Sequence, residues 1–212
     1  MKTFELDNQY YLMRHGQSIA NKEGLIVSKP HNAMNGYGLT TKGAEQVLNA
    51  ALNTRLGRNI VIVSSDYKRA IETANIMHSV LGVTEPVLLE PLLRERDFGN
   101  WELTEHDNYD KVWEEDLNNP TQATNNVETV SQTLTRGLNA IEKLEDQYKG
   151  KKILLVGHGD VLQILCAHHH DINARFHRSL NSIANADIRS LTQAATMQKT
   201  ILSPNQPQAL GA

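Results

Sequence analysis

The sequence predicts an α/β fold with a mainly parallel central sheet and helices on both faces. Short apolar runs rich in β-branched residues predict buried strands at residues 10–13, 60–64, 87–89, 153–157 and 186–191. Between them, helical patterns cover residues 41–56, 67–81, 127–148 and 160–168. Strands that alternate with helices usually form a parallel sheet that is covered on both faces. The pattern leaves the order of the strands open.

We expect a single domain of residues 1–191, followed by a peripheral C-terminal tail of residues 192–212 that is rich in Gln, Ala and Pro. A chain of 212 residues is long enough to bury one substantial core. Residues 21–38 lack a clear period and are expected to form a loop. Residues 100–126 are polar and acidic, and we expect a partly helical cap insertion there, over the site. Insertions of this kind usually set specificity.

Charge and hydropathy exclude several classes of partner. The formal net charge is -3, which gives no basic surface for nucleic acid. No segment is apolar enough to span a membrane, and residues 1–8 are too charged for the core of a signal peptide. We therefore expect a cytoplasmic protein that binds neither nucleic acid nor membranes. Its oligomeric state stays open.

Four segments carry side chains that suit phosphate chemistry. Arg14 and His15 directly follow the first predicted strand, and His158 stands between two glycines after the fourth. Arg69 lies in the first turn of a predicted helix, where unpaired backbone N–H groups and the helix dipole favour an anion. Glu95 lies between two arginines in a predicted loop. Because open α/β sheets bind ligands at the carboxyl ends of their strands, these residues predict one site.

The residue types match the needs of phosphoryl transfer, which are a nucleophile, positive charge around the phosphoryl oxygens and a proton for the leaving group. A neutral imidazole is a competent nucleophile near pH 7. The planar forks of Arg14 and Arg69 suit phosphate oxygens, and Glu95 can supply the proton. Spacing alone does not decide whether His15 or His158 attacks. For the attacking histidine, the second ring nitrogen should donate to a backbone carbonyl of its own turn, which fixes the tautomer.

These segments resemble the histidine phosphatase superfamily, also called phosphoglycerate mutase-like, and the resemblance runs from about residue 10 to residue 191. The family's opening pattern, Arg-His-Gly-(Glu or Gln)-(Ser or Thr) with an asparagine three residues later, is matched by residues 14–18 and Asn21. Its Leu-Thr-x-x-Gly-x-x-Gln, Arg-Ala-x-Glu-Thr-Ala and late His-Gly patterns match residues 39–46, 69–74 and 158–159. The resemblance implies a phosphoglycerate mutase-like fold whose central sheet has one antiparallel strand.

The resemblance also implies a role for each site residue. It makes His15 the nucleophile, which becomes a phosphohistidine, and His158 an electrostatic stabiliser. Glu95 becomes the general acid, because a Leu-x-Glu stretch before an aromatic residue, a glycine and a tryptophan matches the family. Without the resemblance, one end of a surface ion pair would be the simpler interpretation of Glu95, and Arg94 and Arg96 would lower its pKa if they pointed at it. The predicted site consists of catalytic His15, Glu95 and His158 and phosphate-binding Arg14, Asn21 and Arg69.

Two stretches depart from the family pattern. Residues 65–67 read Ser-Asp-Tyr where many members have Ser-Pro-Leu, and residues 101–103 read Trp-Glu-Leu where many have Trp-Glu-Gly. Neither change removes a reacting group. A side chain now stands where glycine allows close approach, so the substrate and the shape of the loop are open.

We expect no metal and no cofactor. Residues 168–170 are three consecutive histidines, but adjacent helical residues point in different directions and cannot all bind one ion. The sequence thus favours a metal-independent phosphomonoesterase that hydrolyses a small phosphorylated substrate through a phosphohistidine. A cofactor-dependent phosphoglycerate mutase is the first alternative, although residues 22–38 lack its substrate-binding stretch and residues 100–126 are acidic. The second alternative is a non-catalytic phospho-ligand binding protein, which would not need an acid.

Overall fold

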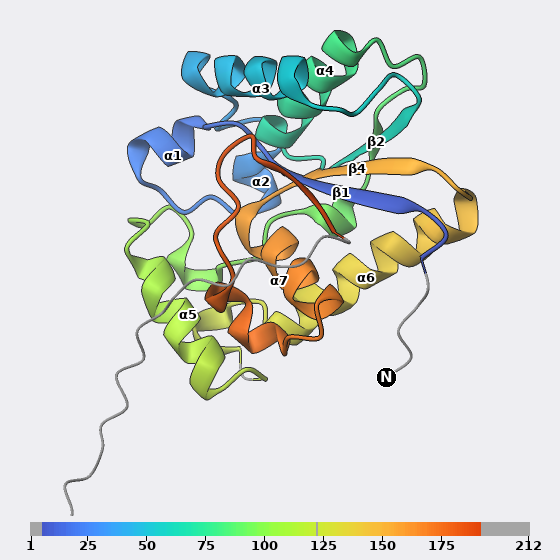
Figure 1. The fold of residues 1–212 in the computed structure, drawn as a ribbon. Coiled ribbons are helices and arrows are strands. Elements are labelled where there is room, and N and C mark those ends of the chain that lie inside the picture. The colour runs from blue at the N-terminus through green and yellow to red at the C-terminus, as the bar shows by residue number, and fades with distance from the viewer. Residues whose placement is uncertain (1–5, 122, 192–212) are drawn as a thin grey trace, which may run out of the picture.

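A five-stranded sheet lies between two layers of helices in the computed structural model, which describes residues 6–121 and 123–191 (Figure 1). The strands stand in the order β3-β2-β4-β1-β5. β1, β2, β3 and β4 are parallel, and β5 is antiparallel to β1. The predicted α/β fold and the antiparallel strand are therefore confirmed. The bounds are β1 Gln9–Arg14, β2 Ile60–Ser64, β3 Leu88–Leu89, β4 Lys152–Gly157 and β5 Ile188–Ser190.

Both faces of the sheet are covered, as the apolar strands predict. Helices α3 and α4 lie on one face, and α6 and α7 lie on the other (Figure 1). Successive side chains of a strand point to opposite faces. Leu12 therefore packs in the cluster on the α6 and α7 side, and Met13 packs in the cluster on the α3 and α4 side. The bounds are α3 Thr41–Asn53, α4 Lys68–Leu81, α6 Val130–Gln147 and α7 Gly159–His169.

The prediction of a loop at residues 21–38 is wrong in part, because two short helices reach into this segment, α1 Ile19–Glu23 and α2 Pro30–Ala33. A capping box starts α1, in which the side chains of Ser18 and Asn21 each accept from the other's backbone N–H. Pro30 opens α2 at a position where the missing N–H costs nothing. Helices this short carry no periodic signal in the sequence.

In the described part of residues 100–126, helix α5 lies between two 3₁₀ turns and apart from the sheet (Figure 1). It packs against the 3₁₀ turn η4 that follows α7. We call residues 100–126 the cap segment. The bounds are α5 Asn108–Asn118, η1 Pro91–Leu93, η2 Gly99–Trp101, η3 Thr124–Asn126 and η4 Ala174–Ser179.

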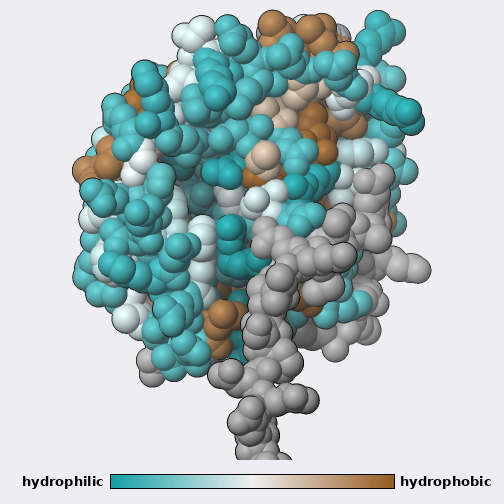
Figure 2. All heavy atoms as spheres, turned by 60° about the vertical axis from the view of Figure 1, so that its left-hand side comes forward, coloured by the Kyte–Doolittle hydropathy of each residue, from teal (hydrophilic) through white to brown (hydrophobic). Residues whose placement is uncertain are grey.

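The carboxyl ends of β1, β4 and β2 meet at one edge of the sheet. The register pairs Arg14 with Gly157 and Ser64 with Val156. His15 and His158 therefore follow neighbouring strands at the same level, and α4 begins close beside them. Figure 2 looks onto this side of the molecule, where hydrophilic residues predominate around a hollow.

The predicted C-terminal tail, residues 192–212, lies outside the described residues. Across residues 6–121 and 123–191, no helix combines the length and the apolar character needed to cross a membrane.

Candidate active site

His15 is a buried imidazole whose two ring nitrogens both make hydrogen bonds. Its Nδ1 lies 2.7 Å from the carbonyl oxygen of Gly16, which can only accept, so Nδ1 carries the hydrogen. This is the predicted hydrogen bond within the turn. Nε2 then accepts from Nε of Arg69 at 3.1 Å. Burial, and after it the charges of Arg69 and Arg14, hold the pKa of His15 well below its usual value. The ring is therefore neutral at pH 7, as a nucleophile must be.

The turn that carries His15 is fixed from several directions. The backbone oxygen of His15 accepts from Nδ2 of Asn185 at 3.0 Å, and Gly16 N donates to Oγ1 of Thr73 at 3.1 Å. The start of α3 packs directly against the turn, because a Cβ on Gly43 would lie 2.0 Å from the carbonyl oxygen of Gln17. This close approach explains why the matched Leu-Thr-x-x-Gly pattern needs its glycine.

Three buried donors near His15 have no hydrogen-bond partner within the described residues, namely Arg14 Nε, Arg69 Nη1 and His158 Nδ1. The rest of each arginine is anchored. Arg69 Nη2 donates to the carbonyl of Val27 at 2.9 Å, and Arg14 Nη1 donates to that of Ile183 at 3.0 Å. A buried donor without a partner typically costs about 1–3 kcal/mol. Three of them in one place therefore indicate a site that an anion completes.

His158 is fully buried at the end of β4. Its Nε2 lies 2.9 Å from Oγ of Ser65, which also accepts from the backbone N–H of Tyr67. The hydroxyl hydrogen of Ser65 is thus available for Nε2, and this network assigns the hydrogen of His158 to Nδ1, the unpartnered atom. Its ring centroid lies 5.2 Å from that of His15. Burial, followed by the charge of Arg69, lowers its pKa well below the usual value, so the ring is neutral and Nδ1 is available to donate to a ligand.

Asn21 lies next to this turn with its amide oriented. Its Oδ1 accepts from the backbone N–H of Ser18 at 3.1 Å and from Nδ2 of Asn185 at 3.2 Å. The amide oxygen is therefore occupied. The donor Nδ2 makes no hydrogen bond within residues 6–121 and 123–191, so it can serve a ligand.

Glu95 is a half-buried carboxyl whose Oε1 accepts from the backbone N–H of Arg96 at 3.0 Å. Burial, and after it the charge of Asp160, raises its pKa, while Arg69 works in the opposite direction. The flanking arginines do not pair with it. Arg94 Nε donates to Asp66 at 2.7 Å, and Arg96 binds Asp116 through both terminal nitrogens at 2.6 Å. Glu95 therefore has the raised pKa that a general acid needs.

Sequence reasoning missed the second carboxylate of this region, Asp160, which is buried at the start of α7. It accepts from Nε1 of Trp113 in the cap segment at 3.1 Å and lies 3.4 Å from Nη1 of Arg96. Burial works to raise its pKa, but His177 and then Arg96 lower it, so it stays ionised beside Glu95. Its partners lie 47 and 64 residues away in the chain. No sequence pattern near Asp160 indicates that these contacts form.

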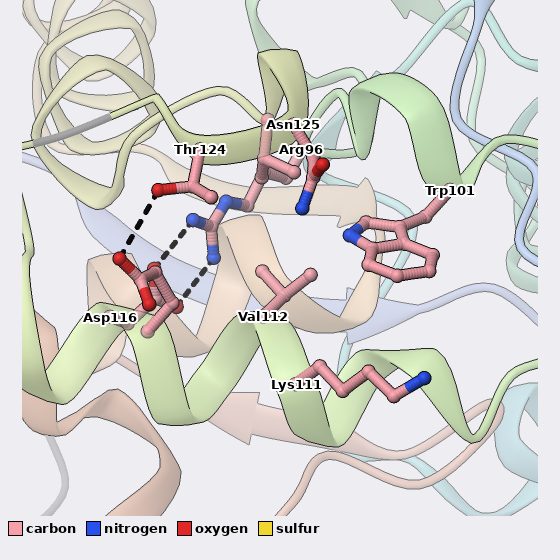
Figure 3. A pocket seen from close by; sticks show the side chains of 9 residues that line it. Arg96, Trp101, Lys111, Val112, Asp116, Thr124 and Asn125 are labelled. Atoms are coloured by element: carbon pink, nitrogen blue, oxygen red, sulfur yellow. Dashed lines mark hydrogen bonds and ion pairs between the residues drawn. The ribbon is translucent and has the colours of Figure 1, made fainter.

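Residues 94–98, between η1 and η2, carry Glu95 and are called the acid loop. A cavity of about 250 Å³ is lined by residues of the acid loop, α5 and η3 and contains none of the predicted site residues (Figure 3). The Arg96–Asp116 ion pair forms one side, and Trp101, Val112 and Asn125 surround the rest. Arg96 has its donors taken by Asp116, by Asp160 and by the carbonyl of Glu128. The candidate active site is therefore the cluster around His15. Within the described ranges, no group of three or more His, Cys, Asp or Glu side chains is placed to hold a metal ion.

Comparison with known proteins identifies the family of this cluster. The model of the histidine phosphatase superfamily (branch 1) matches residues 10–205. The chain belongs to this superfamily. The match spans the strand-end histidines, Arg69 and Glu95, so the recognition made from the sequence is confirmed.

Relatives of this chain include phosphatases and proteins named as mutases. A probable phosphoglycerate mutase GpmB of Escherichia fergusonii is 30% identical over 165 residues, 74% of this chain and 72% of that protein. A metal-independent phosphoserine phosphatase of Arabidopsis thaliana is 28% identical, over 73% of this chain and 65% of that protein. The crystal structure of an alpha-ribazole phosphatase from Shigella flexneri superposes with a TM-score of 0.68 at 27% identity, and covers 90% of this chain and 94% of that chain.

The two departures from the family pattern have visible structural consequences in this chain. Asp66 holds Arg94 of the acid loop, and the Tyr67 hydroxyl donates to the carbonyl of Ser28. Leu103 stands where many members have glycine and adopts a left-handed backbone with φ of 61°. Non-glycine residues pay steric strain in that region. The loop after Glu95 thus has, at Leu103, a backbone conformation that favours glycine, although leucine occupies the position.

Proposed function

We propose that this protein is a metal-independent phosphomonoesterase that hydrolyses a small phosphorylated substrate through a phosphohistidine on His15. The observation that carries the proposal is the set of unpartnered buried donors on Arg14, Arg69 and His158 beside the lone pair of His15. A phosphoryl group brings several acceptor oxygens and negative charge to such a set. Asn21 Nδ2 adds a neutral donor.

In the first half-reaction, Nε2 of His15 attacks phosphorus, a P–N bond forms and the P–O bond to the leaving group breaks. Arg69 exchanges its bond to Nε2 for bonds to the phosphoryl oxygens, and Arg14 and His158 bind the others. The proton of Glu95 passes to the leaving oxygen, so the product departs as a neutral alcohol. The raised pKa of Glu95 favours the protonated form required here.

In the second half-reaction, a water molecule takes the place of the departed alcohol. Glu95 is now a carboxylate and accepts a proton from this water, whose oxygen attacks phosphorus. The P–N bond breaks, inorganic phosphate leaves and the lone pair returns to Nε2. Glu95 ends protonated, so one cycle consumes one ester and one water.

Metal independence is tested with p-nitrophenyl phosphate in excess chelator. We expect hydrolysis to persist and to be inhibited by vanadate, which mimics the five-coordinate phosphorus. A loss of hydrolysis on chelation that added zinc or magnesium restores would contradict the mechanism. Turnover that survives His15→Ala would do so as well, and no turnover by the wild type would favour a phospho-ligand binding protein.

Phosphoglycerate mutation is the second candidate, because a relative named as a probable phosphoglycerate mutase matches over most of its length. The two activities differ in the acceptor of the phosphoryl group, which is water in one and a bound phosphoglycerate in the other. With 3-phosphoglycerate and catalytic 2,3-bisphosphoglycerate, we expect little 2-phosphoglycerate. Rapid interconversion without phosphate release would make the protein a mutase.

A further inference from the structure

Arg178 lies in η4, and its guanidinium has no role in the proposed phosphoryl transfer. Its Cζ lies 3.7 Å from the ring centroid of Trp113, the cap residue that binds Asp160. Its Nη1 donates to Oε1 of Gln163 at 2.7 Å. Stacking on an aromatic ring and one hydrogen bond hold the planar group in place.

Gln163 is itself fixed, which makes the position of Arg178 more definite. This buried side chain donates through Nε2 to the carbonyls of His177 and Leu180, at 2.9 and 3.0 Å. Both amide hydrogens are used, so Oε1 must face Arg178. The guanidinium is therefore preorganised, and a ligand that meets it pays little ordering entropy.

Arg178 lies at the site already described. Asp160, 4.0 Å from its Nη1, follows Gly159, where an added Cβ would lie 3.6 Å from Cζ of Arg14. Burial first lowers the pKa of Arg178; Asp160 raises it, Arg14 lowers it further, and Asp110 and then Glu95 raise it. The general acid and one arm of the phosphate clamp thus lie within electrostatic range of this guanidinium.

The charge of Arg178 is only partly compensated. Its nearest carboxylate, Asp160 at 4.0 Å, also binds Trp113 and Arg96 at shorter distances. Nε and Nη2 make no hydrogen bond within the part of the chain that the structure describes, and 30% of the side chain is exposed. Glu95, the proposed proton donor to the leaving group, is among the charges that act on Arg178. A fixed cation with two open donors in this position is suited to a second anion.

We propose that Arg178 is a specificity-determining residue that binds a second anionic group, a carboxylate or a second phosphate, on the leaving group of the substrate. This inference rests on the proposed phosphomonoesterase function and narrows its substrate class. Trp113 and Gln163 act as positioning residues, since they hold the guanidinium.

Matched substrate pairs test the assignment. 3-Phosphoglycerate and glycerol 3-phosphate differ by a carboxylate, and glucose 1,6-bisphosphate and glucose 6-phosphate differ by a phosphate. We expect kcat/KM of the wild type to favour, in one pair, the member whose leaving group carries the additional anionic group, by about ten- to a hundredfold, the usual range for a charged hydrogen bond. The pair that shows the preference identifies the anion. Where turnover is slow, the same ratio is measured as competitive inhibition of p-nitrophenyl phosphate hydrolysis.

Variants then assign that preference to one residue. Arg178→Gln should reduce the ratio within the preferred pair to about one, and Arg178→Lys, which keeps the charge, should recover part of it. Arg175→Gln is the matched control, because Arg175 lies on the same turn with Cζ 4.5 Å from the ring centroid of Phe176. It should keep the wild-type ratio.

Equal kcat/KM values of the wild type for both members of each pair would overturn the inference. An Arg178→Gln variant with the wild-type ratio of kcat/KM values within the preferred pair would also overturn it. A variant that merely folds poorly would lower both members alike and leave the ratio unchanged, so it also counts against the assignment. Failure of the proposed function has a different signature, since p-nitrophenyl phosphate would then not be hydrolysed by the wild type at all.

Discussion

Two sets of arginines surround the candidate site, and they differ in how their charges are met. The clamp arginines, Arg14 and Arg69, each keep one buried nitrogen without a partner in the described ranges. The loop arginines, Arg94, Arg96 and Arg136, each bind a carboxylate at 2.7 Å or closer. The comparison teaches that a guanidinium paired with a carboxylate holds structure, whereas the unpartnered buried nitrogens of the two clamp arginines beside His15 mark the place of an anion.

The loop arginines have a common task, which is to hold the acid loop. Arg96 is only 2% exposed and binds Asp116 through two nitrogens, which ties this loop to α5. Arg136 reaches from α6 to Glu128 and to the carbonyls of Leu92 and Arg94, which come just before Glu95. Their charges are consumed by these bonds, so the pKa of Glu95 can rise despite two arginine neighbours.

The largest expected effect is that of Arg69→Met on activity. The substitution removes a clamp charge together with the donor that points at Nε2 of His15, so kcat/KM should fall by about 10³-fold. The free energy of unfolding should stay near the wild-type value or rise, because a partly unpaired buried charge is lost. Steady-state kinetics and urea denaturation of the same preparation measure both quantities. A large loss of stability would move Arg69 into the structural set.

Arg96→Met is the matched variant from the other set, and its main effect should be on stability. It leaves Asp116 and Asp160 buried without their shared partner, which typically costs about 3–5 kcal/mol. Urea denaturation with a parallel measurement on Arg69→Met gives the comparison. If Arg96→Met unfolds at the wild-type urea concentration, the division between the two sets is wrong.

Glu95→Gln should separate substrates by leaving group. Water can partly replace a half-buried acid, so the first step on an alkyl phosphate should fall by about 10²-fold, the lower end of the usual range. p-Nitrophenolate leaves without a proton, so its burst should be nearly unchanged. Because the pKa of Glu95 is raised, the protonated acid persists above the ordinary carboxyl range, and alkyl turnover should decline as the pH rises through that value. Rapid-quench kinetics against pH should show this decline in the wild type and not in the variant; equal losses for both substrates would exclude Glu95 as the acid.

Leu103→Gly should give the smallest effect, a gain of about 1 kcal/mol in the free energy of unfolding. The φ of 61° is strained for leucine and free for glycine, and the 45% exposed side chain contributes little packing. Leu48→Gly is the control, since that exposed leucine lies inside α3 and glycine should cost about 1 kcal/mol there. Thermal denaturation compares the two, and destabilisation by both would show that Leu103 is not strained.

The sequence predicted the strand-end part of the site because its geometry is local. His15 and His158 each follow a buried strand, and parallel strands end at one edge, so their proximity was readable. The distinction between clamp and loop arginines could not be predicted from the sequence. For Arg96 it depends on Asp116 and Asp160, which lie 20 and 64 residues away in the chain. Arg178 was missed for the same reason, since nothing near it in the chain indicates the indole beneath it. Short capped helices such as α1 were missed because five residues carry no period.

The most direct measurement of the central claim is the site of phosphoryl attachment. Glu95→Gln, mixed with p-nitrophenyl phosphate and quenched in base, should hold one phosphoryl group on the peptide that contains His15, because the second step lacks its base. The label should be lost in acid, as a phosphoramidate is, and should be absent from Glu95→Gln combined with His15→Ala. A label on the peptide of His158, or one that survives acid, would contradict the account.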